Sequence, residues 1–299
     1  MMQYNQASSG NVLIENQRIE KFPFGDNIDD ITVDSFGEEW SAFHTFSNEE
    51  ISVTGSNYFD IVPENFFNSA IKALDVGCGT GRWSYYLSDK VGFIECIDPS
   101  KAIISAAHLL KGKKNIRISN ASVDNIPFED SSFDLVFSLG VLHHVPDTAD
   151  AIKKCVNKIK QDGFILLYLY YNLENRGVFF KTLFHLSNSI RWIVSKQIPF
   201  LKKTVCDILA ILFYLPFIFT CRLLLFFNVS EKKVSKIPLY WYVDKTFRMI
   251  RNDSLDRFGT PLEQRFSKKQ ITDMLIKAGC KDIVFGDKAP FWRVIAKKI

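Results

Sequence analysis

One stretch of the sequence decides the fold: LDVGCGTG, residues 74–81. It ends an apolar run typical of a buried strand and opens a helical pattern, so it predicts a tight strand-to-helix turn. Three glycines at alternate positions let the backbone turn sharply and let a ligand approach without a Cβ atom in the way. Backbone N–H groups of the turn and of the helix N-terminus would then face a polar ligand that carries a carboxylate.

An acidic residue at the end of the next apolar run supports a nucleoside ligand. Asp98 follows Asp75 by 23 residues, where its carboxylate could accept hydrogen bonds from both hydroxyls of a ribose. The alternative is that Asp98 caps the helix expected to begin near Lys101. A dinucleotide fingerprint would need glycine in place of Arg82, so the register favours another nucleoside cofactor.

The sequence from residue 71 onward alternates short apolar runs with helical stretches, which is typical of βαβ units and a parallel sheet. Predicted strands cover residues 72–76, 93–97, 116–120, 133–138 and 164–170, and predicted helices cover 81–90, 101–110 and 148–160. Ser267 should cap a helix through Ala278, and residues 281–285 and 291–297 should form a hairpin at the sheet edge. We expect an α/β fold: a Rossmann-like doubly wound sheet, mostly parallel with an antiparallel C-terminal hairpin strand, plus a helical cap insertion.

Three regions follow from this pattern. Residues 1–70 would form an N-terminal arm and helices, with the first 25 residues a loose tail or extended arm, since they are polar and aperiodic. Residues 71–172 and 266–299 would form the ligand-binding domain. Residues 173–265 would be a helical, hydrophobic cap, beginning with an amphipathic helix in residues 179–194.

Charge is distributed unevenly along the chain. The net charge of +4 is too small to imply nucleic acid. Residues 1–70 carry twelve acidic and two basic side chains, whereas residues 178–237 carry nine basic and two acidic ones. These regions could face each other, or the basic one could face an anionic surface. The six cysteines have no paired spacing, so neither a metal site nor a disulfide framework is indicated.

Several motifs together resemble the class I S-adenosylmethionine-dependent methyltransferases of the methyltransferase-11 type. They are LDVGCGTG at 74–81, IDPS at 97–100, NIPF at 125–128, FDLVFS at 133–138 and LHHV at 142–145. Their order and spacing fit over about residues 71–170. The resemblance implies an enzyme of this class, with S-adenosyl-L-methionine as its cofactor.

The resemblance also implies which residues hold that cofactor. Gly77, Gly79 and Gly81, after Asp75, would border the methionine portion, and Asp98 would hold the ribose. Many relatives have a Gly-Asp-Ala triplet whose Asp reaches the adenine amine, but this chain has Ala121-Ser122-Val123 there. Adenine recognition would fall to a nearby side chain or to backbone groups. The remaining candidates for cofactor contacts are Ser122, Val123, Asp124 and Ser138.

The methyl acceptor would lie beyond the fourth and fifth strands. If it is a hydroxyl, His143 or His144 could act as general base. Alternatively, one histidine packs and the other bonds a backbone carbonyl. Acceptor contacts are predicted, with loop stabilisation as the alternative role of each, at Tyr171, Asn175, Arg176, Arg257 and Arg265.

Residues 208–227 are almost wholly apolar and allow three interpretations: a membrane span, a buried lid helix beside an apolar pocket, or an interfacial helix. Pro216 and Arg222 argue against a span. Flanking Lys202, Lys203, Lys232 and Lys233 could meet anionic lipid in the interfacial case. Peripheral membrane contact through residues 178–237 is therefore one expectation for this chain.

We expect methyl transfer to a small-molecule acceptor, most simply an O-methylation of a sugar or lipid-linked intermediate. The alternatives are a non-catalytic, cofactor-binding partner subunit and a protein or RNA methyltransferase. A methylated nucleobase is disfavoured, because neither an Asp/Asn-Pro-Pro-aromatic run nor a Pro-Cys nucleophile follows the expected strands. The first residues, MMQYNQASSG, lack the pattern of a signal peptide. A cytoplasmic location, or a peripheral one at the inner membrane surface, is expected.

Overall fold

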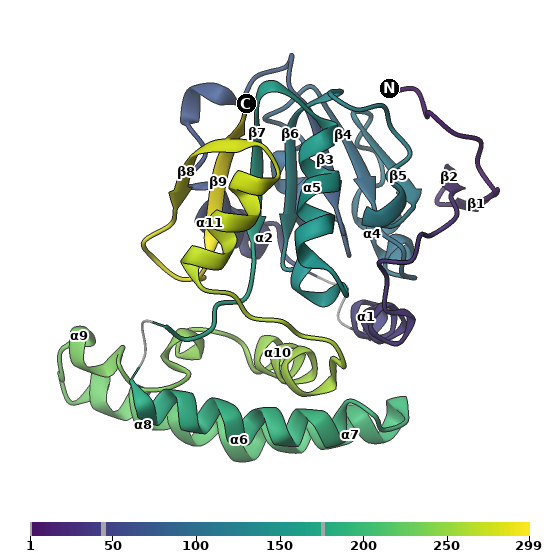
Figure 1. Ribbon diagram of the computed structural model, residues 1–299. Helices are drawn as coiled ribbons and strands as arrows, with labels where there is room; N and C mark the ends of the chain where they lie inside the picture. Colours follow the sequence, from purple (N-terminus) through teal and green to yellow (C-terminus); the bar gives the residue numbers. More distant parts are fainter. Residues whose placement is uncertain (1, 43–45, 175–176) are drawn as a thin grey trace. The chain divides into compact units, whose positions relative to one another are not determined.

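The computed structural model describes residues 2–42, 46–174 and 177–299 (Figure 1). It divides into two compact units. Unit 1 comprises Met1–Glu174 and Leu262–Ile299, and unit 2 comprises Asn175–Pro261. Unit 2 lies within the stretch predicted as an insertion, residues 173–265.

Unit 1 is built on a nine-stranded sheet with the order β1-β2-β5-β4-β3-β6-β7-β9-β8. Its parallel centre consists of β3 (Lys72–Val76), β4 (Phe93–Ile97), β5 (Ile116–Asn120), β6 (Phe133–Leu139) and β7 (Ile159–Tyr168). β9 (Arg293–Lys298) pairs antiparallel with both β7 and the edge strand β8 (Cys280–Phe285). The predicted Rossmann-like sheet with its antiparallel C-terminal hairpin is confirmed.

Helices cover both faces of this sheet, because alternate residues of each buried strand point to opposite sides. In β3, Leu74 and Val76 pack in the core cluster shared with α5 (Thr148–Lys158) and α11 (Lys268–Lys277). Ala73 packs on the other face, against α3 (Arg82–Leu87), α4 (Ile103–Leu109) and α2 (Asn48–Phe59). A short 3-10 helix, η1 (Glu64–Phe66), leads into β3. The turn between β3 and α3 therefore lies at the end of a central strand, in a sheet that helices cover on both faces.

The N-terminal residues do not form a loose tail, which was one of the two alternatives expected for them. β1 (Gly10–Ile14) and β2 (Gln17–Lys21) form an antiparallel hairpin, and β2 continues the sheet by pairing parallel with β5. Glu15 and Asn16, both with positive φ, make the two-residue turn. The turn lacks the usual Asn-Gly signal, and its strands are short and mostly polar, which hid them in the sequence.

Side chains of the same segment are anchored in the sheet. Phe22 is buried in the core, and the Tyr4 ring lies 4.8 Å from the Phe22 ring and 5.5 Å from that of Phe128, centroid to centroid. Arg117 stacks over Tyr4 and makes a two-point ion pair with buried Glu95. These contacts with β4 and β5 hold the first residues on the sheet, although their own sequence has only a weak hairpin pattern.

The limits of two predicted elements differ from the structure at the junction of α5 and β7. The helix predicted over 148–160 ends at Lys158, and the strand predicted from residue 164 begins at Ile159. The register of β6 against β7 shifts between Phe133 and Leu135, and Asp162 has a positive φ of 65°. A bulge thus keeps the Asp-Gly turn signal inside a strand.

Unit 2 is helical. Its elements are α6 (Val178–Val194), α7 (Pro199–Leu209), the π-helical turn η4 (Ala210–Tyr214), α8 (Leu215–Phe226), α9 (Glu231–Val234), η5 (Tyr240–Tyr242) and α10 (Phe247–Gly259). α7, η4 and α8 run on as one helix. Pro216 has no N–H to donate to the preceding turn, which accounts for the widened π segment just before it. The core of unit 2 lies between this helix, α6 and α10.

A pair of phenylalanines tests whether the N-terminal segment is part of the fold. Phe22 is 3% exposed and Phe24 is 41% exposed. Phe22→Ala should lower the free energy of unfolding by about 3–5 kcal/mol, because it empties a core position. Phe24→Ala, two residues away, should change it by less than about 1 kcal/mol. Urea unfolding monitored by circular dichroism measures both, and equal effects would contradict the packing described.

Candidate cofactor and acceptor site

The glycine turn after β3 is shaped by close packing at two positions and by open space at the third. Gly77, Gly79 and Gly81 all have positive φ, of 76°, 55° and 80°. A Cβ atom at Gly77 would lie 2.4 Å from Val141, and one at Gly81 would lie 2.7 Å from Leu110. Among the residues that the structure describes, the atom nearest to a Cβ at Gly79 would be the Trp40 indole nitrogen, at 3.7 Å. The middle glycine therefore borders space that a ligand can use.

The carboxylate of Asp98 meets this turn directly. Asp98 Oδ2 accepts a hydrogen bond from Gly79 N at 2.8 Å, and Oδ1 accepts from Ser100 N at 2.8 Å and Ser100 Oγ at 2.6 Å. Burial raises the pKa of Asp98, while the donors from Ser100 and Gly79 oppose that rise. Asp98 does not cap α4, whose N-cap is Ala102. The two sequence signals thus lie together at the carboxyl ends of β3 and β4.

Asp75 and Ser138 lie beneath the turn. The Asp75 carboxylate is fully buried and accepts a 2.7 Å hydrogen bond from Ser84 Oγ of α3. Burial raises its pKa to about 7. Ser138 Oγ donates to Val76 O at 2.7 Å and so ties β6 to β3. Both residues support the turn from inside the protein.

At the predicted adenine end, the structure separates two candidates. The Ser122 hydroxyl is buried and has no hydrogen-bond partner within the described ranges. Val123 opens the adjacent 3-10 helix, η2 (Val123–Asn125). Asp124 instead pairs with Lys154 and accepts from Asn27 N at 3.1 Å, so its carboxylate holds the N-terminal segment. A buried hydroxyl without a partner is the better candidate for a polar ligand edge.

The N-terminal helix α1 (Asp30–Ala42) covers this region, and the sequence analysis missed its role. Trp40 lies beside Gly79, with its ring 5.1 Å from the Arg82 guanidinium, and its carbonyl accepts from Ser105 Oγ. The Phe36 ring lies 4.8 Å from that of His144. The sequence did contain a signal for this role, because Phe36 and Trp40 are four positions apart and therefore lie on one helix face.

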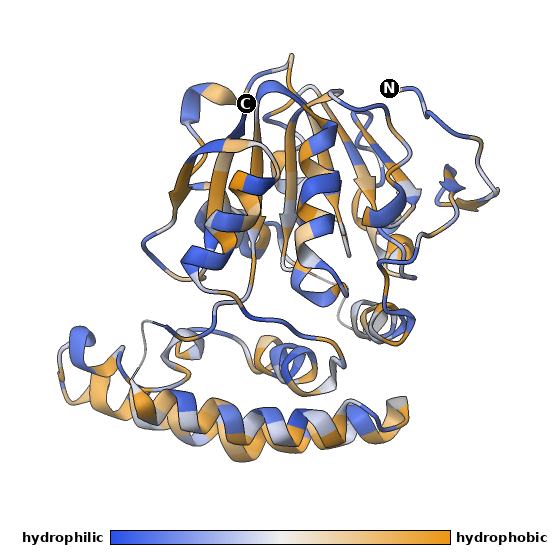
Figure 2. Cartoon of the chain, in the orientation of Figure 1, coloured by the Kyte–Doolittle hydropathy of each residue, from blue (hydrophilic) through white to orange (hydrophobic). Residues whose placement is uncertain are grey.

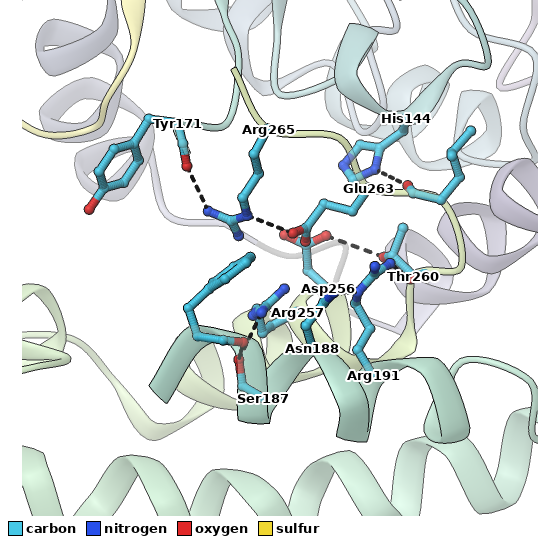
Figure 3. Close-up of polar contacts among 12 residues, drawn as sticks. His144, Tyr171, Ser187, Asn188, Arg191, Asp256, Arg257, Thr260, Glu263 and Arg265 are labelled. Atoms are coloured by element: carbon cyan, nitrogen blue, oxygen red, sulfur yellow. Dashed lines mark hydrogen bonds and ion pairs between the residues drawn. The ribbon is translucent and has the colours of Figure 1, made fainter. Parts of the chain in front are cut away.

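His143 and His144 occupy a buried 3-10 turn, η3 (Leu142–His144), after β6. His144 Nδ1 lies 2.7 Å from Leu262 O (Figure 3). A carbonyl can only accept, so Nδ1 carries a proton, and in the neutral imidazole Nε2 would present the lone pair. The His143 ring stacks on Tyr170 at 3.8 Å between centroids, and burial holds its pKa well below the usual range. The arrangement matches the packing alternative and is also compatible with His144 acting as a base.

Arg265, in the C-terminal part of unit 1, lies near the two histidines. Its Nε donates to Glu263 Oε1 at 2.8 Å, its Nη1 donates to Tyr171 O at 3.2 Å, and its guanidinium lies 5.1 Å from the Tyr170 ring centroid. The Tyr171 ring points away from Arg265 in Figure 3 and packs on Phe291 and Trp292. Arg265 is therefore placed beside the histidines, whereas Tyr171 contributes its backbone there.

The other predicted acceptor contacts belong to unit 2. Arg257 donates to Ser187 Oγ at 2.8 Å and stacks over Phe184, which ties α10 to α6. Asn175 and Arg176 lie outside the described residues. An acceptor role for these three residues stays a prediction.

The family model described as a methyltransferase domain matches residues 74–167. This match begins at the glycine turn and ends in β7, so it includes Asp98, Ser122 and both histidines. The chain carries a class I methyltransferase domain. S-adenosyl-L-methionine is the cofactor of this class.

Three curated relatives resemble the methyltransferase domain. An uncharacterized methyltransferase, YcgJ, of Bacillus subtilis is 30% identical over 107 residues, which are 35% of this chain and 42% of that protein. The chloroplastic tocopherol O-methyltransferase of Arabidopsis thaliana is 38% identical over 104 residues, 32% of this chain and 29% of that protein. The demethylmenaquinone methyltransferase of Staphylococcus haemolyticus is 36% identical over 99 residues, 32% of this chain and 41% of that protein. The matches span less than half the length of each relative.

The residues around the turn fit S-adenosylmethionine. The open side of Gly79 suits its amino-acid portion, the Asp98 carboxylate suits the ribose hydroxyls, and the unpartnered Ser122 hydroxyl suits the adenine edge. A carboxylate offers about four acceptor positions, and three are occupied by Gly79 and Ser100. Asp98 can therefore accept a ribose hydroxyl without rearrangement of the turn.

The ribose assignment is tested by removing one carboxylate. Asp98→Ala should weaken binding of S-adenosylhomocysteine by about 10-fold to 100-fold, since each lost charge-assisted hydrogen bond is worth about 1.5–3 kcal/mol. Asp89→Ala removes an exposed carboxylate of the same unit, paired with Lys113, and should leave affinity unchanged. Isothermal titration calorimetry compares the two variants. Equal affinities would move the nucleoside site elsewhere.

Asp75 should give the domain a characteristic pH dependence. Its pKa is raised in the folded state, so its contribution to stability is full below the unfolded pKa, near 4, and is lost as pH rises to about 7. Asp75→Asn cannot ionise and keeps an acceptor for Ser84. The stability of wild type relative to Asp75→Asn should therefore fall by a few kcal/mol, on the order of the linkage energy, between pH 4 and 8. Urea unfolding across this range measures it, and parallel curves would disprove the assignment.

Proposed function

We propose that the chain transfers the methyl group of S-adenosylmethionine to a small-molecule acceptor, a hydroxyl of a sugar or lipid-linked intermediate. The observation that carries the proposal is the bond between Gly79 N–H and the Asp98 carboxylate, which joins the glycine turn to the predicted ribose ligand. The unpartnered Ser122 hydroxyl adds a third contact of the right kind. Together these features support a nucleoside site at the end of β3 and β4.

The chain's own residues need only bind, orient and exclude water. When bound, the cofactor supplies an electrophilic methyl group on a sulfonium, so the reaction is an in-line displacement. Trp40 and Phe36 of α1 line the carboxyl ends of β3 and β6 with apolar rings. Such a cover keeps water from competing with the acceptor.

We infer that His144 would receive the acceptor proton. Its Nδ1–H bond to Leu262 O fixes the tautomer, so the hydroxyl proton would move to Nε2 as the new O–C bond forms. His143 stays neutral beside it, because burial disfavours its charged form. Arg265, which is paired with Glu263, lies at the same end of the sheet and would orient a polar acceptor there.

Two relatives support an acceptor with lipid character. Their names give tocopherol and demethylmenaquinone as the molecules they methylate, and both compounds are lipid-soluble. The name of the first also specifies transfer to oxygen. These activities belong to the relatives, and they favour an apolar acceptor molecule for this chain.

Methyl transfer is tested with radiolabelled cofactor and extracts of cells that lack the protein. His144→Asn keeps an N–H to bond Leu262 O but removes the base, so label transfer should fall by about 10²–10⁴-fold. S-adenosylhomocysteine affinity should stay unchanged. His108→Asn changes an exposed histidine of α4, is the matched control and should transfer label at the wild-type rate.

The labelled fraction then identifies the acceptor class. Label in lipid or sugar-containing small molecules supports the proposal, and label in protein or RNA contradicts it. Cofactor binding without label in any fraction would indicate a non-catalytic partner subunit. Wild-type turnover by His144→Asn would exclude this histidine as the base.

A further inference from the structure

The long helix of unit 2 exposes a continuous apolar face. Phe200–Phe226 has a mean hydropathy of 2.3 in its most apolar window, yet only 28% of that window is buried. Figure 2 shows hydrophobic colouring along α8 and α6. We call the following six side chains, each at least 44% exposed, the apolar face: Ile208, Ile211, Leu212, Phe219, Leu223 and Phe226.

The opposite face of the same helix already has a partner. Cys206, Leu209 and Tyr214 pack in the core of unit 2 with Ile250 and Phe258 of α10. The buried-lid interpretation therefore accounts for one face only. An exposed apolar surface of this length is uncommon in water-soluble proteins and marks a contact with another apolar medium.

Polar groups near the apolar face are bonded within unit 2. Thr220 Oγ1 donates to Pro216 O at 2.8 Å, one helical turn back. Thr204 Oγ1 donates to Phe200 O in the same way, at 2.9 Å. Arg222 Nε donates to Val243 O at 2.9 Å. The two hydroxyls thus need no water to satisfy their donors, so they can enter an apolar medium at little cost.

Exposed cations flank the apolar face at both ends. Lys196 lies before the helix, with its Nζ 3.7 Å from the centroid of the exposed Trp192 ring. Lys232, Lys233 and Lys236 follow the helix and are also exposed. Paired Trp and Lys side chains are typical of the lipid headgroup level. Lys202 was also expected to meet anionic lipid, but it is only 6% exposed and is therefore not one of the exposed lysines that flank the apolar face.

The charges on the other side of the helix argue against a membrane span. Asp207 of α7 makes a two-point ion pair with Arg251 of α10, at 2.7 and 2.5 Å. α10 packs along α7 and also carries Asp253 and Asp256. If the helix crossed a bilayer, this charged layer would enter the hydrocarbon, which is costly. If the helix lay along the surface, the same layer would stay on the water side.

We propose that unit 2 docks on an anionic lipid bilayer through the apolar face. The helix lies parallel to the surface, its apolar side chains reach the acyl boundary, and the flanking lysines meet lipid phosphates. A helix of 27 residues provides a contact about 40 Å long. This partner is additional to the proposed methyl transfer and does not depend on it.

Vesicle co-sedimentation of the full chain tests the docking. Binding to vesicles of phosphatidylcholine with phosphatidylglycerol should exceed binding to phosphatidylcholine alone by at least about tenfold and should weaken with salt. The double variant Leu212→Glu with Phe219→Glu should lose at least about tenfold in binding, because two charges replace apolar anchors. Leu13→Glu changes a leucine of unit 1 that is 69% exposed and should bind like wild type.

Three results would overturn the proposal. The first is failure of the wild type to pellet with either vesicle. The second is self-association that the double variant abolishes without any lipid binding, which would assign the face to a second copy. The third is retention in vesicles after an alkaline carbonate wash, which would indicate a span. An unchanged circular dichroism spectrum of the double variant shows that unit 2 is folded. Unchanged S-adenosylhomocysteine affinity separates loss of docking from loss of the methyltransferase site.

Discussion

The hydrogen bond from Gly79 N–H to the Asp98 carboxylate fixes the geometry on which the rest of the site depends. It joins the turn after β3 to the end of β4, next to the point between β3 and β6 where the strand order reverses. Ligands of open α/β folds bind at this switch point, because helices on opposite faces leave a crevice there. Gly77 and Gly81 allow the turn to pack against Val141 and Leu110, which leaves the Gly79 side open.

Two buried carboxylates have different roles in this arrangement. Asp98 has three donors and remains near the ligand side, while Asp75 lies deeper with Ser84 as its donor. Desolvation raises the pKa of both, so each costs stability when ionised. The fold tolerates this loss of stability at both carboxylates. α1, the histidine turn and Arg265 lie at the same edge of the sheet.

The sequence predicted the central sheet and the cofactor turn well, because both rest on local signals. Apolar runs bounded by turn residues define β3 to β6, and the Ser267 capping box defines α11. The β1–β2 hairpin was missed because its stability comes from Phe22, Tyr4 and the edge of β5 rather than from its own pattern. Asp124 was a reasonable adenine candidate by position, but its pairing with Lys154 is a long-range contact that no local pattern contains.

The long helix of unit 2, Phe200–Phe226, is another feature that local sequence patterns predict only in part. Its hydropathy identified an unusual segment, but composition cannot say which face is covered. Only the packing shows that Cys206 and Leu209 face inward while Leu212 and Phe219 face outward. The role of α1 was likewise not predicted, because the spacing of Phe36 and Trp40 does not say that they lie beside His144 and Gly79.

A crystal structure of the full chain with S-adenosylhomocysteine tests the central claim most directly. The account predicts a ribose hydroxyl on the Asp98 carboxylate, the amino-acid portion beside Gly79 and the adenine near Ser122. A nucleoside bound away from the carboxyl ends of β3 and β4, or Trp40 filling the space beside Gly79 with no nucleoside bound at saturating concentration, would contradict it.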